Sequence, residues 1–476
     1  MIGGGIGGLT AASLLSKAGL SVTVFEKGER VGGKLNILES NGFSWDTGPS
    51  LITMPQILRD LWQRLDRPFG LDLVRLETSC RYFWTDGTVI DENAGFWKRP
   101  EVARFLRHAG GIFDISESTF LHRQPGAWWK KLSFGRLIHL PKIVDRRSLY
   151  QLAKHFFRDP HLLQLFCRFA TYNGSSPFLT PAAFSVIPYT QAKFGSWYIR
   201  GGLYRIAEEL EKICRENGVR FIMQAEVSSI NRRRDRYVVG TRCHTITEFD
   251  LIVCNEDVIT ADSEIVPLCA RRGYAGQNRM LSTSGFVMML AVRETFKELS
   301  HHNVFFSDNY TAEFDQIFRQ KVAPGEPTIY VAIDSKTEPG RAPVGFESWF
   351  VLVNVPAFRN RGGSRWGRIP EHYYPLIIRR LDKFGLKGLA DSVLERHFLT
   401  PLDFSNRLNA FGGSLYGFAS HGLFTAFRRP PMQNPKMPNM WFVGGTTHPG
   451  GGIPLVIISG EIAAASILNS QLISRK

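Results

Sequence analysis

A glycine-rich turn, followed by a helix and a short strand, opens the chain. The turn has the pattern GxGxxG, formed by Gly3, Gly5 and Gly8. Apolar residues then recur at helical spacing over residues 9–18, and the strand pattern Ser21–Phe25 ends at Glu26. This order of turn, helix, strand and acid is typical of a Rossmann-type dinucleotide-binding unit. It therefore places the chain in the α/β class.

Each residue of the motif has a separate role in such a unit. Gly3 permits the tight turn, Gly5 lets a pyrophosphate approach the backbone, and Gly8 lets the helix pack on the strand. Glu26 has the spacing of an acid that hydrogen-bonds the adenosine ribose, which disfavours NADP. A glycine-rich turn can also be purely structural, but here the helix, the second strand and the acid are all in register.

The first strand of the unit is nearly missing from the sequence. Only Met1 and Ile2 precede Gly3, whereas a typical strand has about five residues. A start site assigned too late, a trimmed chain and a short strand are the three explanations that stay open.

A second glycine-rich turn lies near the other end of the chain. Residues 440–443 have the pattern of a buried strand, and residues 455–465 have that of a helix. A helix N-terminus exposed by glycines attracts negative charge, because its free N–H groups and its dipole point outward. The predicted binding residues of this turn are Gly444, Gly445, Gly452, Ile453 and Pro454.

Segments between the two turns narrow the predicted cofactor to FAD. Gly32–Lys34 follows Glu26 closely, Phe43–Ser50 is expected as a turn-rich loop, and residues 218–230 predict two short strands beside the nucleotide. In this order the segments resemble the FAD-binding fold that amine oxidases and carotenoid desaturases share. The candidate FAD-binding residues of these segments are Lys27, Gly33, Lys34, Asp46, Gly48, Pro49, Ser50 and Val227.

The specific resemblance is to the bacterial phytoene desaturase family, and it runs the full length of the chain. The C-terminal THPGGGIP at residues 447–454 is the most specific motif. The family usually has Arg where this chain has Lys34, and a lysine is only a point charge. The other matching segments are residues 42–55, 172–177, 195–203, 301–306, 327–330, 342–345 and 351–356.

The resemblance implies an FAD-dependent desaturase that transfers hydride from an apolar carotenoid or isoprenoid precursor to noncovalently bound FAD. The flavin is needed because side chains alone cannot accept hydride from an unreactive C–C bond. Since the sequence has one dinucleotide fingerprint, we expect quinone or oxygen as the electron acceptor. The alternatives are a carotenoid oxygenase or ketolase of the same family, a flavin amine oxidase, and a non-enzymatic flavin-bound lipid carrier.

The order of the motifs implies a discontinuous, Rossmann-type FAD-binding domain, formed by residues 1–75, 195–265 and 405–476. A substrate domain with a mixed β-sheet is expected over residues 76–99 and 266–404. A helical, membrane-associating cap is expected over residues 100–194.

Desaturation also releases a proton, which a base must accept. The sequence contains no carboxylate–histidine constellation that names one. The candidates are Asp403, Glu347 and His448, and each is more often a structural residue.

Cysteine and histidine usage argues against a metal. The six cysteines include no CxxC pair, as expected for reduced, mostly buried thiols of a cytosolic protein. His301 and His302 are adjacent, and neighbouring side chains of a strand point to opposite faces. No third ligand is in view, so we expect no metal site.

Part of the net charge of +15 is concentrated in one segment. Residues 128–158 carry eight basic residues against Asp145 alone, interleaved with tryptophan and phenylalanine. Rings and cations together are typical of a surface that binds anionic membranes, and a solvated helical face is the alternative. The basic residues are Lys130, Lys131, Arg136, Lys142, Arg146, Arg147, Lys154 and Arg158.

Other functions that a positive net charge can serve have less support in the sequence. The sequence has no nucleic-acid-binding motif, no secretory signal, and no apolar run of the roughly 20 residues that span a bilayer. We therefore expect a cytoplasmic protein that is peripherally bound to the membrane and does not bind nucleic acid.

Overall fold

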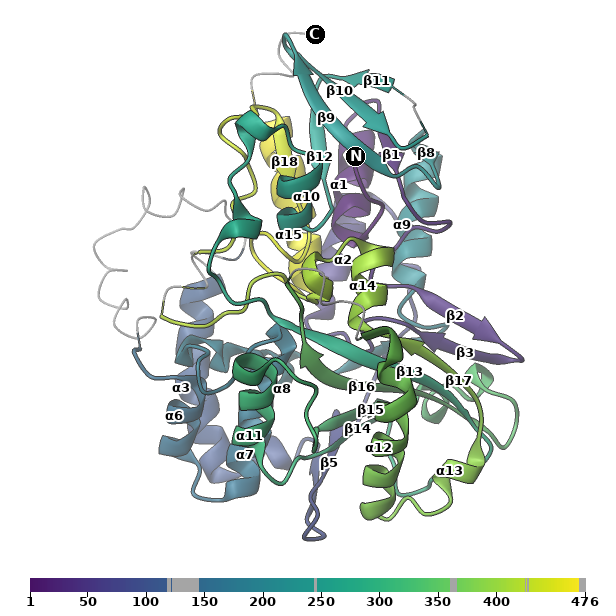
Figure 1. Ribbon diagram of the computed structural model, residues 1–476, viewed down its shortest axis with the longest axis vertical. Coiled ribbons are helices and arrows are strands. Elements are labelled where there is room, and N and C mark those ends of the chain that lie inside the picture. The colour runs from purple at the N-terminus through teal and green to yellow at the C-terminus, as the bar shows by residue number, and fades with distance from the viewer. Residues whose placement is uncertain are drawn as a thin grey trace.

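The computed structural model describes residues 1–117, 121, 145–243, 246–359, 366–423, 425 and 428–470. Figure 1 shows a parallel sheet with its helices in the upper half, a larger sheet below it, and a group of helices at the lower left. Residues 128–144 of the predicted membrane segment lie outside the described residues.

The parallel sheet contains four short strands and one bridging residue. Strand β1 (Thr23–Phe25) pairs with β8 (Arg220–Ile222), and β12 (Ile252–Cys254) pairs with β18 (Met440–Phe442). Ile2 joins the two pairs through parallel bridges to Phe25 and Cys254. A single residue therefore completes the sheet where a full first strand is usual in this fold.

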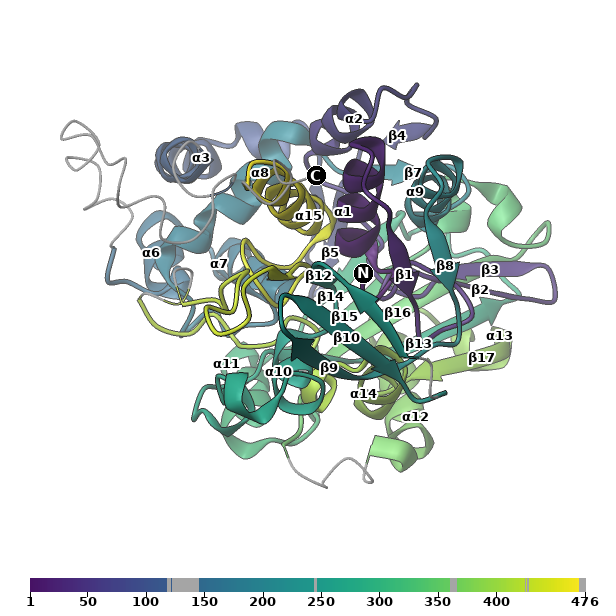
Figure 2. The same ribbon diagram turned by 90° about the horizontal axis from the view of Figure 1, so that it is seen from above.

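Helices cover one face of the parallel sheet and a second sheet covers the other. Leu9, Leu210 and Ile457 belong to one apolar core with Val24 and Val253 of the strands. They come from α1 (Ile6–Lys17), α9 (Arg205–Glu216) and α15 (Ile453–Leu468). The opposite face packs on the antiparallel strands β9 (Val227–Arg233), β10 (Arg236–Thr241) and β11 (Ile246–Phe249). Figure 2 shows both layers from above.

The larger sheet has seven strands in the order β17-β13-β16-β15-β14-β5-β6, with only β14 and β5 parallel. Its strands are β5 (Cys80–Phe83), β6 (Val89–Glu92), β13 (Thr283–Val292), β14 (His302–Phe305), β15 (Ile329–Ala332), β16 (Glu347–Pro356) and β17 (Val393–Leu399). Alternate residues of β13 enter different cores: Met288 packs toward α12 (Ile369–Lys383), whereas Val287 faces the other side.

A helical group packs beside this sheet around an aromatic core that includes Phe105, Phe157 and Phe166. Its helices are α3 (Pro100–Ser116), α6 (Leu149–Phe156), α7 (Pro160–Arg168) and α8 (Val186–Phe194), with α11 (Tyr310–Asp315) nearby. Ser148 and Gln151 form a capping box that fixes the start of α6, and Asp159 caps α7.

One local expectation was wrong. Phe43–Asp46 is strand β3, paired with β2 (Ile37–Ser40), rather than the first half of a loop. Phe43 and Trp45 are buried on one face, which is the alternation of a strand. The remaining elements are α2 (Pro55–Arg64), β4 (Leu73–Arg75), β7 (Trp197–Ile199), α10 (Val258–Glu264), α13 (Leu389–Ser392) and α14 (Pro401–Leu408).

The mixed α/β class is confirmed. The exact division into three domains stays a prediction.

Candidate functional site

A cavity of about 470 Å³ is bordered by residues of both the parallel sheet and the seven-stranded sheet. All the predicted cofactor-binding residues border it except Gly8 and Asp46. The structure therefore brings together segments from the two ends and the middle of the chain.

The first glycine turn is packed too closely for side chains. Gly3 has a φ of +85°, and a Cβ on Gly8 would lie 2.4 Å from the Gly3 carbonyl oxygen. A Cβ on Gly5 would lie 2.6 Å from Nδ2 of Asn255. No side chain caps the start of α1, so its first N–H groups are available to an anion beside Gly5.

Asn255 is a site residue that the sequence reasoning missed. It follows β12 directly and borders the cavity, and its Oδ1 is buried without a hydrogen-bond partner among the described residues. Its position at the carboxyl end of a parallel strand is the signal that could have found it, because ligands bind at that edge.

The Glu26 carboxylate is fixed where β1 ends. Oε2 accepts the Gly4 N–H and Oε1 accepts the Gly28 N–H, both at 2.7 Å. Each oxygen has a second lone pair, so the carboxylate can still accept a hydroxyl hydrogen bond. The neighbouring Lys27 Nζ lies 3.3 Å from the Glu226 carboxylate.

Lys34 borders the cavity with a buried ammonium group. Burial lowers the pKa of its ammonium, whereas the nearby Asp257 carboxylate acts to raise it. The ammonium donates to the carbonyl of Leu415. A Cβ on Gly48 would overlap the Lys34 carbonyl, so this stretch requires glycine.

The second glycine turn presents another helix N-terminus. Gly444 and Gly452 have φ values of +105° and +101°, and no side chain caps the start of α15. Gly452, Ile453 and Pro454 border the cavity. The positive end of the α15 dipole is therefore available to negative charge there.

Apolar and aromatic residues form the part of the wall that faces the larger sheet. Val287 of β13 and Phe350 and Leu352 of β16 lie there, with Phe404 of α14. The same wall contains Arg168, Tyr172, Tyr310 and Tyr330.

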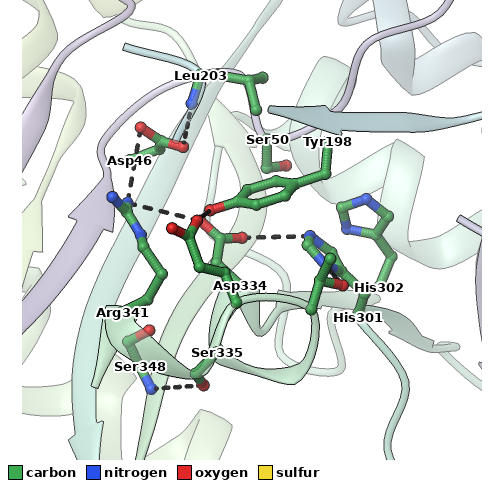
Figure 3. Close-up of polar contacts among 12 residues, drawn as sticks. Asp46, Ser50, Tyr198, Leu203, His301, His302, Asp334, Ser335, Arg341 and Ser348 are labelled. Carbon is green, nitrogen blue, oxygen red and sulfur yellow. Dashed lines mark hydrogen bonds and ion pairs between the residues drawn. The ribbon is translucent and has the colours of Figure 1, made fainter. Parts of the chain in front are cut away.

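A buried polar network lies behind this wall (Figure 3). Tyr330 Oη lies 2.6 Å from Ser50 Oγ and 2.8 Å from His302 Nδ1. Burial and the charges of His301 and Arg168 lower the pKa of His302, so its imidazole stays neutral. The wall hydroxyls of Ser50 and Tyr330 are therefore oriented by a neutral imidazole that does not retain an added proton.

The two histidines do not point apart as expected. Their ring centroids are 4.3 Å apart, because His301 precedes the first residue of β14 and escapes the alternation of the strand. Figure 3 shows the network continuing from His301 to Asp334, Arg341 and Asp46.

Asp46 supports the wall without bordering it. Its Oδ2 accepts the Leu203 N–H at 2.8 Å, and burial and the Asp334 charge raise its pKa to about 7. It therefore anchors the strand that leads into residues 48–50.

The three candidate bases lie elsewhere. Asp403 caps α14 by accepting from Thr400, and Glu347 pairs with Lys336 at 2.7 Å. His448 is buried beside its cis peptide bond to Pro449. Within the described residues none of the three borders the cavity. Their catalytic role stays a prediction that the geometry does not favour.

Comparison with known proteins identifies the family of the chain. Residues 6–468 match the family described as flavin containing amine oxidoreductase. The chain belongs to this family. It is an FAD-dependent oxidoreductase, and the residues around the cavity fit that cofactor: two uncapped helix N-termini for negative charge, and glycines that leave room beside them.

Relatives of known activity cover almost the whole chain. It is 33% identical to a 1-hydroxycarotenoid 3,4-desaturase of Flavobacterium sp., over 99% of both chains. It is 32% identical to a 4,4'-diapolycopene oxygenase of Methylomonas sp., over 98% of this chain and 97% of the relative. A 4,4'-diaponeurosporene oxygenase of Staphylococcus aureus is also 32% identical, over 100% and 99%. The resemblance to the carotenoid desaturase family is confirmed.

Solved structures confirm the fold. A triple mutant of putrescine oxidase matches 100% of this chain and 98% of its own, with a TM-score of 0.67 and 16% identity. An oxidoreductase from Methanosarcina mazei matches 98% of this chain and 99% of its own, with a TM-score of 0.64 and 17% identity.

Proposed function

We propose that the chain is an FAD-dependent desaturase of a carotenoid or carotenoid precursor. One observation carries the proposal: the glycine turns and the apolar wall of Val287, Phe350 and Leu352 border the same cavity. The names of the relatives support a carotenoid substrate. The amine oxidase structures support only the fold.

The cofactor-binding residues predicted from the sequence become the proposed FAD site. The α1 N-terminus and Gly5 would hold the diphosphate, and Glu26 would hold the ribose. Gly452–Pro454 would place the α15 N-terminus against the part of the flavin that gains negative charge.

Desaturation removes a hydride and a proton from neighbouring carbons. FAD, when bound, supplies the hydride acceptor that no side chain provides. The apolar wall excludes water and holds the polyene. Ser50 and Tyr330, whose hydroxyls are hydrogen-bonded to each other and to Nδ1 of His302, can relay the released proton, which His302 does not retain because burial lowers its pKa. Quinone or oxygen is the proposed final electron acceptor.

Carotenoid oxygenation is the second candidate. The relatives named as oxygenases are 32% identical to this chain, against 33% for the desaturase, so identity does not separate the two. Both activities would use the same apolar wall.

Peripheral binding to an anionic membrane is proposed for the helical region. In the described part of the basic segment Arg146, Lys154 and Arg158 are exposed, while Arg147 pairs with Asp145 at 2.7 Å. Among the described residues, no helix is both long and apolar enough to cross a bilayer.

Pigment analysis tests the proposal and separates the two candidates. The chain is expressed in a host that supplies acyclic carotenoids of increasing desaturation, and the pigments are analysed by chromatography and mass spectrometry. A desaturase product loses two hydrogens and absorbs at longer wavelength. Gain of an oxygen atom would support the oxygenase, and unchanged pigments with every precursor would contradict both.

A further inference from the structure

Arg168 is a buried cation in the cavity wall that the proposed reaction does not use. It is the last residue of α7, is 7% exposed, and borders the cavity. An arginine stays charged at any pH that a protein experiences. A permanent charge in an apolar chamber is costly unless something binds it.

Aromatic rings surround this guanidinium. Its carbon lies 5.6 Å from the ring centre of Tyr82, 5.3 Å from that of Tyr172 and 5.7 Å from that of Tyr330. Such contacts partly offset the cost of burying a cation. They do not satisfy its N–H donors in the way an oxygen acceptor would.

The hydrogen bonds of Arg168 are weak and come from one nitrogen. Nη1 lies 3.5 Å from the hydroxyls of both Tyr82 and Tyr172, beyond the usual range for N–H···O bonds. Within the described ranges, no carboxylate lies within the 4.0 Å of an ion pair. The Glu92 carboxylate is reached through Tyr82, which donates to its Oε2 at 2.5 Å.

A second polar group in the same wall has no partner. The Tyr310 hydroxyl is buried, and in the described part of the chain nothing accepts from it or donates to it. Arg168 lies close enough for its charge to act on the pKa of Tyr310. A guanidinium and an unpaired hydroxyl therefore border the same cavity, beside Tyr172, Tyr330 and Glu313.

We propose that Arg168 and Tyr310 form a subsite for a neutral oxygen, a hydroxyl or carbonyl, borne by the end of the polyene. This inference rests on the proposed carotenoid substrate and names the subclass that the site selects. A hydrocarbon cannot use these donors, whereas an oxygen atom accepts from both. A neutral oxygen is favoured because burying the charge of a carboxylate in this cavity costs more than burying a hydroxyl or carbonyl that is hydrogen-bonded.

A matched pair of substrates tests the subsite. The FAD-loaded protein is given one acyclic polyene with a terminal hydroxyl and the same polyene without it. Because a hydrogen bond to a charged donor is lost with the hydrocarbon, kcat/KM should be about tenfold or more higher for the hydroxylated member. In Arg168→Met this preference should disappear, mainly through a higher KM for the hydroxylated member.

Two variants serve as controls. Tyr82→Phe keeps the ring beside Arg168 and removes a hydroxyl of a residue that does not border the cavity, and it should keep the preference. Arg168→Lys retains the charge without the planar fork and should keep part of the preference. It also replaces Arg168→Met as the test if the methionine variant does not fold.

A binding measurement distinguishes failure of the proposed subsite from failure of the proposed desaturase activity. Quenching of tryptophan fluorescence by each polyene reports affinity even if neither is desaturated. A hydroxyl preference that Arg168→Met abolishes supports the subsite whatever the reaction. Equal affinity of the parent for both polyenes, tighter binding of the matching carboxylate, or an equal loss for both substrates in Arg168→Met would overturn it.

Discussion

Two backbone N–H groups hold the Glu26 carboxylate at the edge where the proposed ribose would bind. Replacing Glu26 by Arg removes both acceptors and introduces a positive charge. We expect Glu26→Arg to purify with little FAD, measured as the ratio of flavin to protein absorbance. Glu29→Arg, at an exposed position three residues later, should keep the ratio of the parent. Full FAD content in Glu26→Arg would show that the ribose is held elsewhere.

Glu92 makes stability depend on pH. Burial raises its pKa from 4.5 to about 7. The folded state therefore keeps a proton that the unfolded state releases between these values, and stability falls as pH rises through this window. The loss is on the order of 3 kcal/mol.

Urea denaturation at pH 5 and pH 8 measures this loss. Glu92→Gln should show a difference between the two pH values that is smaller than that of the parent by on the order of 3 kcal/mol, and the rest comes from other buried acids such as Asp46. The same change at exposed Glu77 should leave the difference as in the parent. An unchanged difference in Glu92→Gln would mean that other groups cause the pH dependence.

Among individual residues, the sequence predicts best those that belong to strong local motifs. Glu26, Lys34 and all the predicted glycines except Gly8 border one cavity, because each belongs to a local motif of turn and strand that the sequence specifies strongly. Asn255 and Arg168 were not found, because their surroundings come from contacts between segments distant in sequence. Asp403 and Glu347 were chosen for their chemistry alone, and the structure gives them capping and pairing roles.

Helices α1 and α15 carry the two proposed anion-binding N-termini, and they pack closely where Gly460 of α15 faces Gly7 and Thr10 of α1. A Cβ on Gly460 would lie 2.6 Å from the Gly7 carbonyl oxygen and 2.8 Å from Thr10 Cβ. Gly460→Ala should force the helices apart, lower the free energy of unfolding by about 1–3 kcal/mol and reduce FAD content. Denaturant unfolding and flavin absorbance measure both effects.

Gly111→Ala in α3 is the matched control. Nothing lies within 4 Å of its added Cβ, so the higher helix propensity of alanine should raise stability by up to about 1 kcal/mol. If both variants behave alike, close packing of α1 and α15 does not position the site.

Elements with strong local patterns were predicted best. The strands at β1, β8, β9 and β18 and helices α1 and α15 lie where turn residues and apolar periodicity indicate them. The order of the seven-stranded sheet, with β5 beside β14, could not be predicted, since it depends on pairing across more than 200 residues. Strand β3 was missed because only four residues show its alternation of apolar and polar side chains, and the turn residues that follow indicate a loop.

At the scale of the whole molecule, the net charge of +15 has a proposed use at the membrane. Changing Lys130, Lys131, Arg146 and Arg147 to Glu should weaken binding to anionic liposomes without altering the flavin spectrum. Each basic residue near such a surface contributes roughly 1 kcal/mol, and the attraction decays over about 8 Å at physiological salt. Co-sedimentation at low and high salt measures the effect.

The β9–β10 hairpin provides a control with the same change in charge. Arg232, Arg233, Arg234 and Arg236 are exposed there. Their replacement by Glu should leave liposome binding closer to that of the parent. If the two variants lose binding equally, net charge alone governs it and residues 128–158 are an ordinary helical cap.

The central claim is that one cavity holds FAD and a polyene together. The most direct test is a single turnover without oxygen, in which FAD-loaded protein is mixed with an acyclic carotenoid in liposomes. We predict that flavin absorbance bleaches while a polyene with one more double bond forms in equal amount, and that admitting quinone or oxygen restores the flavin. Flavin that stays oxidised with every carotenoid tested, but bleaches with an amine, would contradict the account.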